Sequence, residues 1–405
     1  MIRKISYVIN KEIKGIWGDE PKTDDEVTPV IKTNNMTYEG NINYDSLTLR
    51  YIPKEKLLDS YLSTGDLLIE KSGGTKYHSV GYINFFDGEN NKYVCNNFVL
   101  VLRPNKALVK PKFLFYQIKY KYESNQFSDC YNKTTGIQNL QIKSYISKII
   151  KCPDISTQSN QTHSLDKICS CIHKKKKQID FLDSLVKSRF NEMFGDPNLN
   201  KCLFKKERID HFVTCVAGAT PSTSVEQYWN NGTISWLSSG EVNKGRIFFT
   251  DKKITNLGYK KTSTKMIPCH TVVMAMAGQG NTRGTVGVAE IPLCTNQSIC
   301  SLVGNKELID TDYLYVCLNL MYELIRSMSN GAEGRGGLNL KIIGGIEIPL
   351  PPLTLQNRFA AFVKQIDKSK FVGHSRYFLW LNLTLESSTI AYSRVVSICE
   401  WPKRR

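Results

Sequence analysis

The sequence predicts a mixed α/β protein with two similar domains in tandem, separated and followed by long helices. First, the order of motifs in one half of the chain recurs in the other half about 200 residues later. Second, apolar residues over 165–193 recur at alternating steps of three and four, as in a coiled coil. Third, 405 residues are more than one ordinary domain needs.

Each half has the same order of expected elements. An apolar strand enters a Gly-rich loop, two more strands follow, and then come an aromatic helix, an N-L-x-I segment, a short strand and a Pro-marked turn. The strand and loop are expected at 67–74 and 272–280, and the helix at 113–122 and 313–328. Duplication by itself fits stability or symmetry equally well. Because the loops differ, we favour two sites of one kind that read different things.

The two halves can be paired residue by residue near their ends. We pair Asn139 and Leu140 with Asn339 and Leu340, and Gln158 with Gln356. The expected division of the chain is a first domain at 1–152, a central helix at 153–197, a second domain at 198–350, a distal helix at 351–371 and a tail at 372–405.

The central helix is expected to begin after Pro153, with Ser156 or Thr157 as its N-cap, and to end before Gly195. Its apolar positions include 165, 168, 172, 179, 182, 186 and 193. A helix of roughly 38 residues is ~57 Å long, which exceeds one ~34 Å turn of B-DNA. We favour a coiled-coil seam, which pairs antiparallel with a distal helix capped by Thr354. The alternative is a long amphipathic helix packed only on its own domain.

The charge balance favours a polyanionic partner. The chain has 54 Lys and Arg residues against 37 Asp and Glu, a formal charge of +17. Such an excess suits nucleic acid, because each phosphate contact releases counterions. The alternative is a protein that is basic without such a partner. The lysine run at 174–177 fits a phosphate-contacting stripe and a solvated helix face equally well.

The cysteines and the N-terminus point to a reducing compartment. The twelve cysteines contain no C-x-x-C, so we expect neither a zinc site nor a redox motif. The N-terminus lacks the apolar core of a signal peptide, and no apolar run approaches the ~20 residues needed to cross a bilayer. We therefore expect a cytoplasmic protein with no membrane partner.

Two pairs of loops contain the candidate DNA-binding residues. Gly allows close backbone approach, while Gln, Asn and Arg are the side chains that read base edges. A structural turn is the alternative for each loop, and it is our preferred interpretation of Asn139 and Asn339. The candidates are Lys71, Ser72, Gly73, Gly74, Lys76, His78, Gln138, Gln279, Asn281, Thr282, Arg283 and Arg335.

Catalytic motifs are missing from the sequence. The glycines at 278–284 do not have the spacing of a dinucleotide loop, and no Walker motif, H-E-x-x-H, G-x-S-x-G or N-P-P-Y-type tetrapeptide occurs. No compact D…E-x-K spacing suggests a nuclease. We therefore expect no catalytic residues and no metal site in this chain.

Four segments resemble the specificity subunits of Type I restriction-modification enzymes. Residues 178–197 (QIDFLDSLVKSRFNEMFGDP) closely resemble the central spacer helix of that family. Residues 338–357 (LNLKIIGGIEIPLPPLTLQN) are similar to the exit from a target recognition domain there. The loops at 70–74 and 275–284 resemble recognition-domain loops. The likeness covers residues 1 to about 371.

The resemblance implies a function and partners. It implies that each domain reads one half of a bipartite target in double-stranded DNA, with the helices fixing the gap. It implies a scaffold for two adenine-N6 methyltransferase subunits and for ATP-driven restriction subunits. S-adenosylmethionine, ATP and magnesium would then belong to those partners, with no cofactor in this subunit.

The distal helix departs from the family pattern. Gly373 is expected to break it, and the leucines from Leu379 to Leu385 alternate at a strand period. We therefore expect a helix that ends near Phe371 and an atypical tail from a frameshifted or recombined end. Two alternatives to the specificity subunit stay open: a self-contained nuclease or DNA-modifying enzyme with two binding repeats, and an orphan recognition protein that no longer assembles.

Overall fold

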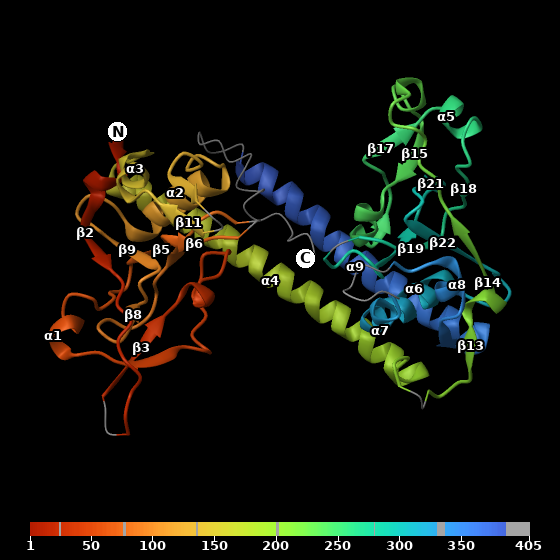
Figure 1. Ribbon diagram of the computed structural model, residues 1–405, viewed down its shortest axis with the longest axis horizontal. Helices are drawn as coiled ribbons and strands as arrows, with labels where there is room; N and C mark the ends of the chain where they lie inside the picture. Colours follow the sequence, from red (N-terminus) through yellow and green to blue (C-terminus); the bar gives the residue numbers. More distant parts are fainter. Residues whose placement is uncertain are drawn as a thin grey trace. The chain divides into compact units, whose positions relative to one another are not determined.

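The computed structural model describes residues 1–23, 26–75, 78–134, 137–199, 202–278, 280–329 and 337–385. They form two compact units, Met1–His173 and a second that begins at Lys174 (Figure 1). The division falls inside the helix α4 (Ile155–Phe194). Each unit is a mixture of strands and helices, as predicted.

Unit 1 is organised around a four-stranded sheet with the order β2-β9-β5-β7, followed in the chain by helix α2 (Pro111–Glu123). The sheet consists of β2 (Ile9–Lys14), β9 (Val99–Pro104), β5 (Leu67–Glu70) and β7 (Ile83–Phe85). A second sheet consists of β4 (Thr48–Tyr51), β3 (Val27–Ile31) and β8 (Val94–Cys95), with α1 (Lys54–Leu57) after β4. A third sheet consists of β10 (Tyr131–Thr134), β11 (Ile137–Leu140) and β6 (Ser72–Gly73). The chain leaves the unit through α3 (Ile142–Ser147) and β12 (Ile149–Lys151), which pairs with β1 (Ile2–Lys4).

Unit 2 repeats this plan with extra strands. Its main sheet has the order β14-β22-β19-β20-β16. The strands are β14 (Val213–Ala217), β22 (Ile299–Gly304), β19 (Thr271–Ala275), β20 (Val286–Ala289) and β16 (Arg246–Ile247). The second sheet consists of β17 (Lys252–Ile254), β15 (Ile234–Leu237), β21 (Leu293–Thr295) and β18 (Met266–Ile267), with α5 (Asn256–Lys260) between β17 and β18. The helices α6 (Thr311–Leu320), α7 (Tyr322–Ser327) and α8 (Leu340–Gly344) precede β23 (Glu347–Pro349), which pairs with β13 (Lys206–Arg208).

The two units share strand pairings as well as element order. Strand β5 lies between β9 and β7, and β19 lies between β22 and β20, antiparallel throughout. Every residue of β5 and of β19 is buried. This burial explains why both strands are mainly apolar, apart from Glu70 and Thr271, and do not alternate between polar and apolar residues.

The hydrogen bonds of the Gly-rich loops correct the residue pairing near the end of each repeat. The Leu140 N–H donates to the carbonyl of Lys71 (2.8 Å), and the Leu338 N–H donates to that of Met276 (2.9 Å). Leu140 therefore corresponds to Leu338, and its expected pairing with Leu340 is wrong by two residues. Asn339 caps α8 by accepting from the Ile342 N–H (2.9 Å), so it supports a turn as expected. Asn139 instead lies within β11, because the first domain has a strand at this point.

Helix α4 confirms the long central helix. Its N-cap is Asp154, whose Oδ1 accepts from the Thr157 N–H (2.8 Å), so neither Ser156 nor Thr157 has that role. The most buried positions near its end are Phe190 and Phe194, both 0 % exposed, which the 3-4 stepping left out. The buried positions continue from Val186 in steps of four, so Phe190 and Phe194 lie in the core of unit 2. The predicted position, Met193, is only partly buried at the edge of this core.

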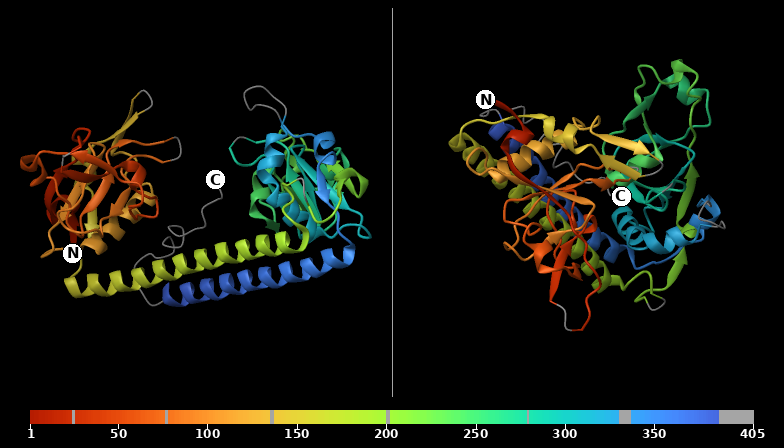
Figure 2. Two further views of the ribbon diagram at one scale, coloured as in Figure 1. Left: turned by 90° about the horizontal axis from the view of Figure 1, so that it is seen from below. Right: turned by 60° about the vertical axis from the view of Figure 1, so that its left-hand side comes forward.

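Helix α9 (Leu353–Leu385) packs against the second half of α4 (Figure 2). Phe359 contacts Phe190, and Lys370 forms an ion pair with Asp183 at 2.6 Å. Higher numbers on α9 meet lower numbers on α4, so the two helices are antiparallel, as predicted.

Two details of α9 differ from the sequence expectation. The helix begins at Leu353, so Thr354 lies in its first turn and is not its N-cap. The expected end near Phe371 is wrong, because the helix continues through Gly373 to Leu385. A single glycine costs a helix interior about 1 kcal/mol and does not by itself end it. The remainder of the predicted tail lies outside the described residues.

Candidate nucleic-acid interface

In unit 1 the structure brings the two predicted loop segments together. Strand β11 pairs antiparallel with β6, which places Gln138 opposite Gly73 and Asn139 opposite Ser72. The Ser72 hydroxyl donates to the Asn139 side chain, and the Val80 N–H donates to Gln138 Oε1 (3.2 Å). Segments 65 residues apart in the sequence therefore form one hydrogen-bonding surface, which also explains why Asn139 does not form a turn.

The glycines of this surface are required by its backbone. Gly73 and Gly74 have φ angles of 125° and 71°, which favour glycine. A Cβ at Gly74 would lie 3.0 Å from Gln138 Oε1, and one at Gly73 would lie 2.7 Å from Glu70 Oε1. The Glu70 carboxylate accepts from the Gly74 N–H (3.4 Å), and burial raises the pKa of this carboxyl. The loop therefore follows closely around a buried carboxyl group.

The other candidates of unit 1 lie on the same loop. The His78 ring stacks on Tyr38 with 3.7 Å between centroids. The Lys71 N–H donates to the carbonyl of Phe98 (2.9 Å), whose side chain is half exposed. Lys76 lies outside the described residues.

In unit 2 the predicted loop is the connection between β19 and β20, held by helix α7. The Tyr322 hydroxyl donates to the carbonyl of Asn281 (2.9 Å), and Arg326 donates to Asn281 Oδ1 (3.2 Å) and to the Tyr322 hydroxyl (2.6 Å). Gly278 and Gly280 have φ angles of 138° and 68°, so the loop needs both glycines.

The remaining candidates of unit 2 are only partly described. Thr282 and Arg283 are half-buried, and the Thr282 carbonyl accepts from the Thr285 N–H (3.1 Å), so Thr282 closes the turn. Gln279 and Arg335 lie outside the described residues. Sequence reasoning missed Tyr322 and Arg326; the available signal was a Tyr and an Arg four residues apart on the aromatic helix.

Arg326→Ala is expected to weaken binding of the DNA target roughly 5- to 30-fold, equivalent to about 1–2 kcal/mol. The loop would lose the side-chain contact that fixes Asn281. The measurement is fluorescence anisotropy with a labelled duplex that carries the target. Arg358→Ala, at an exposed position of α9, is the control and is expected to bind like the parent protein. Equal binding by the two variants would show that the hydrogen bond from Arg326 to Asn281 is not needed for binding.

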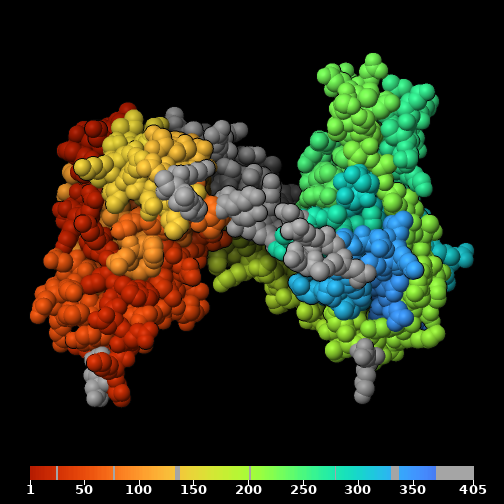
Figure 3. Space-filling view, viewed as in Figure 1, coloured from red at the N-terminus to blue at the C-terminus, as the bar shows by residue number. Residues whose placement is uncertain are grey.

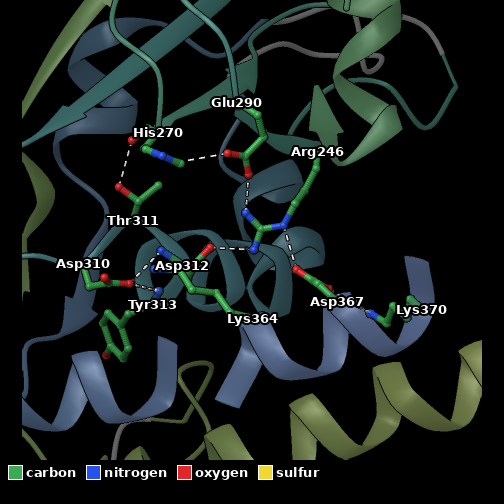
Figure 4. A network of polar contacts seen from close by, with 10 residues as sticks. All are labelled: Arg246, His270, Glu290, Asp310, Thr311, Asp312, Tyr313, Lys364, Asp367 and Lys370. Atoms are coloured by element: carbon green, nitrogen blue, oxygen red, sulfur yellow. Dashed lines mark hydrogen bonds and ion pairs between the residues drawn. The ribbon is translucent and has the colours of Figure 1, made fainter. Parts of the chain in front are cut away.

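A buried network in unit 2 gathers acidic side chains away from this loop (Figure 4). Arg246 on β16 donates to Glu290 (2.5 Å), Asp312 on α6 (2.6 Å) and Asp367 on α9 (2.7 Å). Burial opposes the guanidinium charge, but Asp312 and Asp367 raise the pKa of Arg246 above its ordinary value. Lys370 links Asp367 to Asp183 on α4 (3.6 and 2.6 Å). The carboxylates are thus committed to an arginine, and the network joins the second domain to both helices.

A buried glutamine connects each domain to the long helix that follows it, Gln158 in unit 1 and Gln356 in unit 2. We call the hydrogen bonds of each glutamine the glutamine joint. Gln158 Oε1 accepts from the Lys110 N–H (2.8 Å), and its Nε2 donates to the carbonyls of Leu108 (3.3 Å) and Pro153 (2.8 Å). Both glutamines of the predicted pair are 0 % exposed. At Gln356 the corresponding partners are Asp310 (2.9 Å), Leu308 (3.0 Å) and Pro351 (2.8 Å).

The ion pair beside each joint has opposite polarity in the two units. Lys112 on α2 pairs with Asp166 on α4 at 3.1 Å, while Asp312 on α6 pairs with Lys364 on α9 at 3.7 Å. The positions correspond, so the joint keeps its geometry while its charges are exchanged.

The described ranges contain neither a candidate metal site nor a candidate membrane-spanning helix. Among those residues, no group of three or more His, Cys, Asp or Glu side chains is placed to hold a metal ion. In the same ranges, no helix combines the length and apolarity that crossing a membrane requires.

Comparison with known proteins identifies both halves. The family model described as Type I restriction modification DNA specificity domain matches residues 2–181 and again residues 203–372. The MjaX specificity subunit assigned to a type I restriction enzyme of Methanocaldococcus jannaschii is 22% identical over 330 residues, which are 78% of this chain and 75% of that protein. The EcoR124I/EcoR124II specificity subunit of Escherichia coli is 20% identical over 279 residues, 65% of this chain and 64% of that one.

A solved structure shows the same fold. The S subunit of a Type I restriction-modification system from M. genitalium matches with a TM-score of 0.56 and 15% identity, over 93% of this chain and 91% of that one. The family model covers most of the chain, once in each half. The chain therefore belongs to the Type I restriction-modification DNA specificity family, as a non-catalytic specificity subunit with one specificity domain in each half.

Proposed function

We propose that the chain reads a bipartite DNA target, with each half recognised by the Gly-rich loop of one unit. The observation that carries the proposal is the equivalence of the two loops. Each follows the buried central strand of its sheet, and each is fixed at Lys71 or Met276 by the same two backbone hydrogen bonds. Within that shared frame the polar side chains differ, as two readers of different bases require.

The chemistry of the loops supports base-edge contacts. In unit 1, the Ser72 hydroxyl and the Asn139 amide meet where β6 pairs with β11, and Gln138 belongs to the neighbouring residue pair. In unit 2, Asn281 and Arg326 meet at the β19–β20 loop. Amides and guanidinium groups form the bidentate contacts that distinguish bases in the major groove, and the positive charge of +17 favours approach to the phosphates.

We also propose that the subunit works within an assembly in the cytoplasm. Its partners are two adenine-N6 methyltransferase subunits and, for cleavage, restriction subunits. S-adenosylmethionine, ATP and magnesium belong to those partners, and this chain contributes recognition and a scaffold.

The exposed apolar residues of α4 are proposed to contact a methyltransferase subunit. Phe181 is 66 % exposed and Leu185 is 38 % exposed, one helical turn apart. The double change Phe181→Ser and Leu185→Ser is expected to reduce co-purification of the methyltransferase at least tenfold, because these side chains would lose an apolar partner. The control is Lys177→Ser with Lys187→Ser, two exposed positions on the same helix. Equal recovery of the methyltransferase with both variants would contradict this contact.

Methylome sequencing tests the proposed function. Genomic DNA from the host with and without this gene is compared for N6-methyladenine. We expect a bipartite motif with a gap of fixed length that disappears on deletion. If no motif disappears, the orphan alternative is correct; if the purified chain alone methylates or cleaves DNA, the enzyme alternative is correct.

A further inference from the structure

The second sheet of unit 2 contains a lysine-rich segment that lies outside the loops proposed to read bases. Residues 252–265 contain five lysines and no acidic residue. All five are exposed, and they are Lys252, Lys253, Lys260, Lys261 and Lys265. They lie on β17, at the end of α5 and in the turn that leads to β18. The segment therefore runs from one edge strand of the sheet to the other. We call these five residues the lysine surface.

The lysine surface has no ion-pair partners in the described part of the chain, although Glu226 lies on the short helix that packs against α5. Within the ranges that the structure describes, no carboxylate forms an ion pair with any of the five. The closest acid in sequence, Asp251, pairs with Lys244 at 2.9 Å. One of the five, Lys252, lies over the Trp229 ring at 5.7 Å. Five positive charges over 14 residues repel one another, and a bound polyanion would relieve that repulsion.

The corresponding part of unit 1 does not have this property. There Lys54 pairs with Glu26 (3.0 Å), Arg50 with Glu20 (3.4 Å) and Lys11 with Asp59 (2.7 Å). The two units share the fold at this place, so the fold does not require the lysines. Their charge is a property of the second domain alone.

The lysine surface is also separate from the loop proposed to read bases. That loop connects two strands of the main sheet, whereas β17 and β18 are the edges of the second sheet. Figure 1 shows α5 and β17 at the end of unit 2 away from α9, and the space-filling view shows this end at the molecular surface (Figure 3).

We propose that the lysine surface binds the phosphate backbone of duplex DNA outside the bases that are read, in a manner independent of sequence. The proposal rests on the function proposed above and adds a second contact to the second domain. The residue type supports it, because the segment contains lysines and no arginine. Lysine binds phosphate as a flexible point charge, while arginine forms the bidentate contacts that distinguish bases.

The test is the salt dependence of DNA binding by the complex of this chain with its methyltransferase subunits. The probe is a labelled 60-base-pair duplex (about the length of six helical turns) that carries the motif from the methylome. Five changes, K252Q, K253Q, K260Q, K261Q and K265Q, remove the surface. Each lost phosphate contact lowers the slope of log affinity against log salt by about 0.9. If two to five lysines contact phosphate, the parent complex loses roughly 10- to 500-fold more affinity than the variant between 50 and 200 mM salt.

A matched control separates this contact from net charge. The changes K11Q, K54Q, K92Q, K148Q and K205Q remove the same charge from lysines that already pair with carboxylates. The control is expected to keep the parent slope, and the surface variant is expected to keep the parent motif in its methylome. The proposal is overturned if the surface variant has the parent slope or if the control changes the slope equally. A parent complex with no preference for its motif would instead overturn the proposed function.

Discussion

Replacing Arg246 with alanine is expected to lower the free energy of unfolding of unit 2 by about 3–5 kcal/mol, because Glu290 and Asp312 lose the guanidinium they share. Within the described residues, these carboxylates keep only His270 and the more distant Lys364 as partners. The side chains of Glu290 and Asp312 are 9 % and 6 % exposed, so water cannot replace the guanidinium. The loss is measured by urea unfolding followed by tryptophan fluorescence. Arg246→Lys is expected to recover only part of the loss. The planar guanidinium donates to three carboxylates from separate nitrogen atoms, and a single ammonium group cannot reach all three.

The control for this prediction is Arg208→Ala. Arg208 pairs with Asp210, and both side chains are more than 40 % exposed. Exposed ion pairs contribute about 0–1 kcal/mol, so this variant is expected to unfold almost like the parent protein. If Arg246→Ala costs no more than Arg208→Ala, the network does not hold the second domain to its helices.

Replacing Gln356 with alanine is expected to cost about 2–4 kcal/mol in the same measurement, because one buried N–H and two buried carbonyls lose their partner. Gln158→Ala is expected to cost unit 1 a similar amount, since three of the hydrogen bonds of Gln158 have equivalents at Gln356. Gln178→Ala is the control: that glutamine is exposed, and in the described part of the chain its side chain accepts one hydrogen bond, from Lys175 (2.9 Å). It is expected to change stability by less than about 0.5 kcal/mol.

The contacts of Gln158 and Gln356 are expected to affect methylation as well as stability. The glutamine joint ties the start of each long helix to the loop before α2 or α6, so it sets how the domain is seated on that helix. At a temperature where the variants remain folded, both are therefore expected to reduce methylation of the motif. Full methylation by folded Gln158→Ala and Gln356→Ala proteins would mean that the joint serves stability only.

The repeat and the long helices could be predicted from the sequence because both leave periodic patterns. The strands β5 and β19 and helix α4 follow from apolar runs and 3-4 stepping. The predicted pairing of Asn139 with Asn339 is wrong. It rests on the Asn-Leu dipeptide that both segments contain, and it ignores the distance in sequence from each dipeptide to the glutamine that follows it. The joint at Gln158 and Gln356 defines the correct offset, with Leu140 matching Leu338.

The contacts that build the proposed recognition surfaces could not be predicted, because they join segments distant in sequence. The pairing of β6 with β11 brings Gln138 to Gly73, and no local pattern marks it. The tether from Arg326 to Asn281 depends on how α7 meets the loop. The end of α9 was misplaced for a different reason: Gly373 weakens the local preference for helix, but the helix continues past it.

The claim that each unit reads one half of the target is tested most directly by the methylomes of two loop variants. One strain carries Ser72→Ala with Gln138→Ala, and the other carries Asn281→Ala with Arg326→Ala. We expect the first pair to relax the bases of one half of the motif and the second pair to relax those of the other half, with the gap unchanged. The account is contradicted if both variants alter the same half or if either one alters both halves.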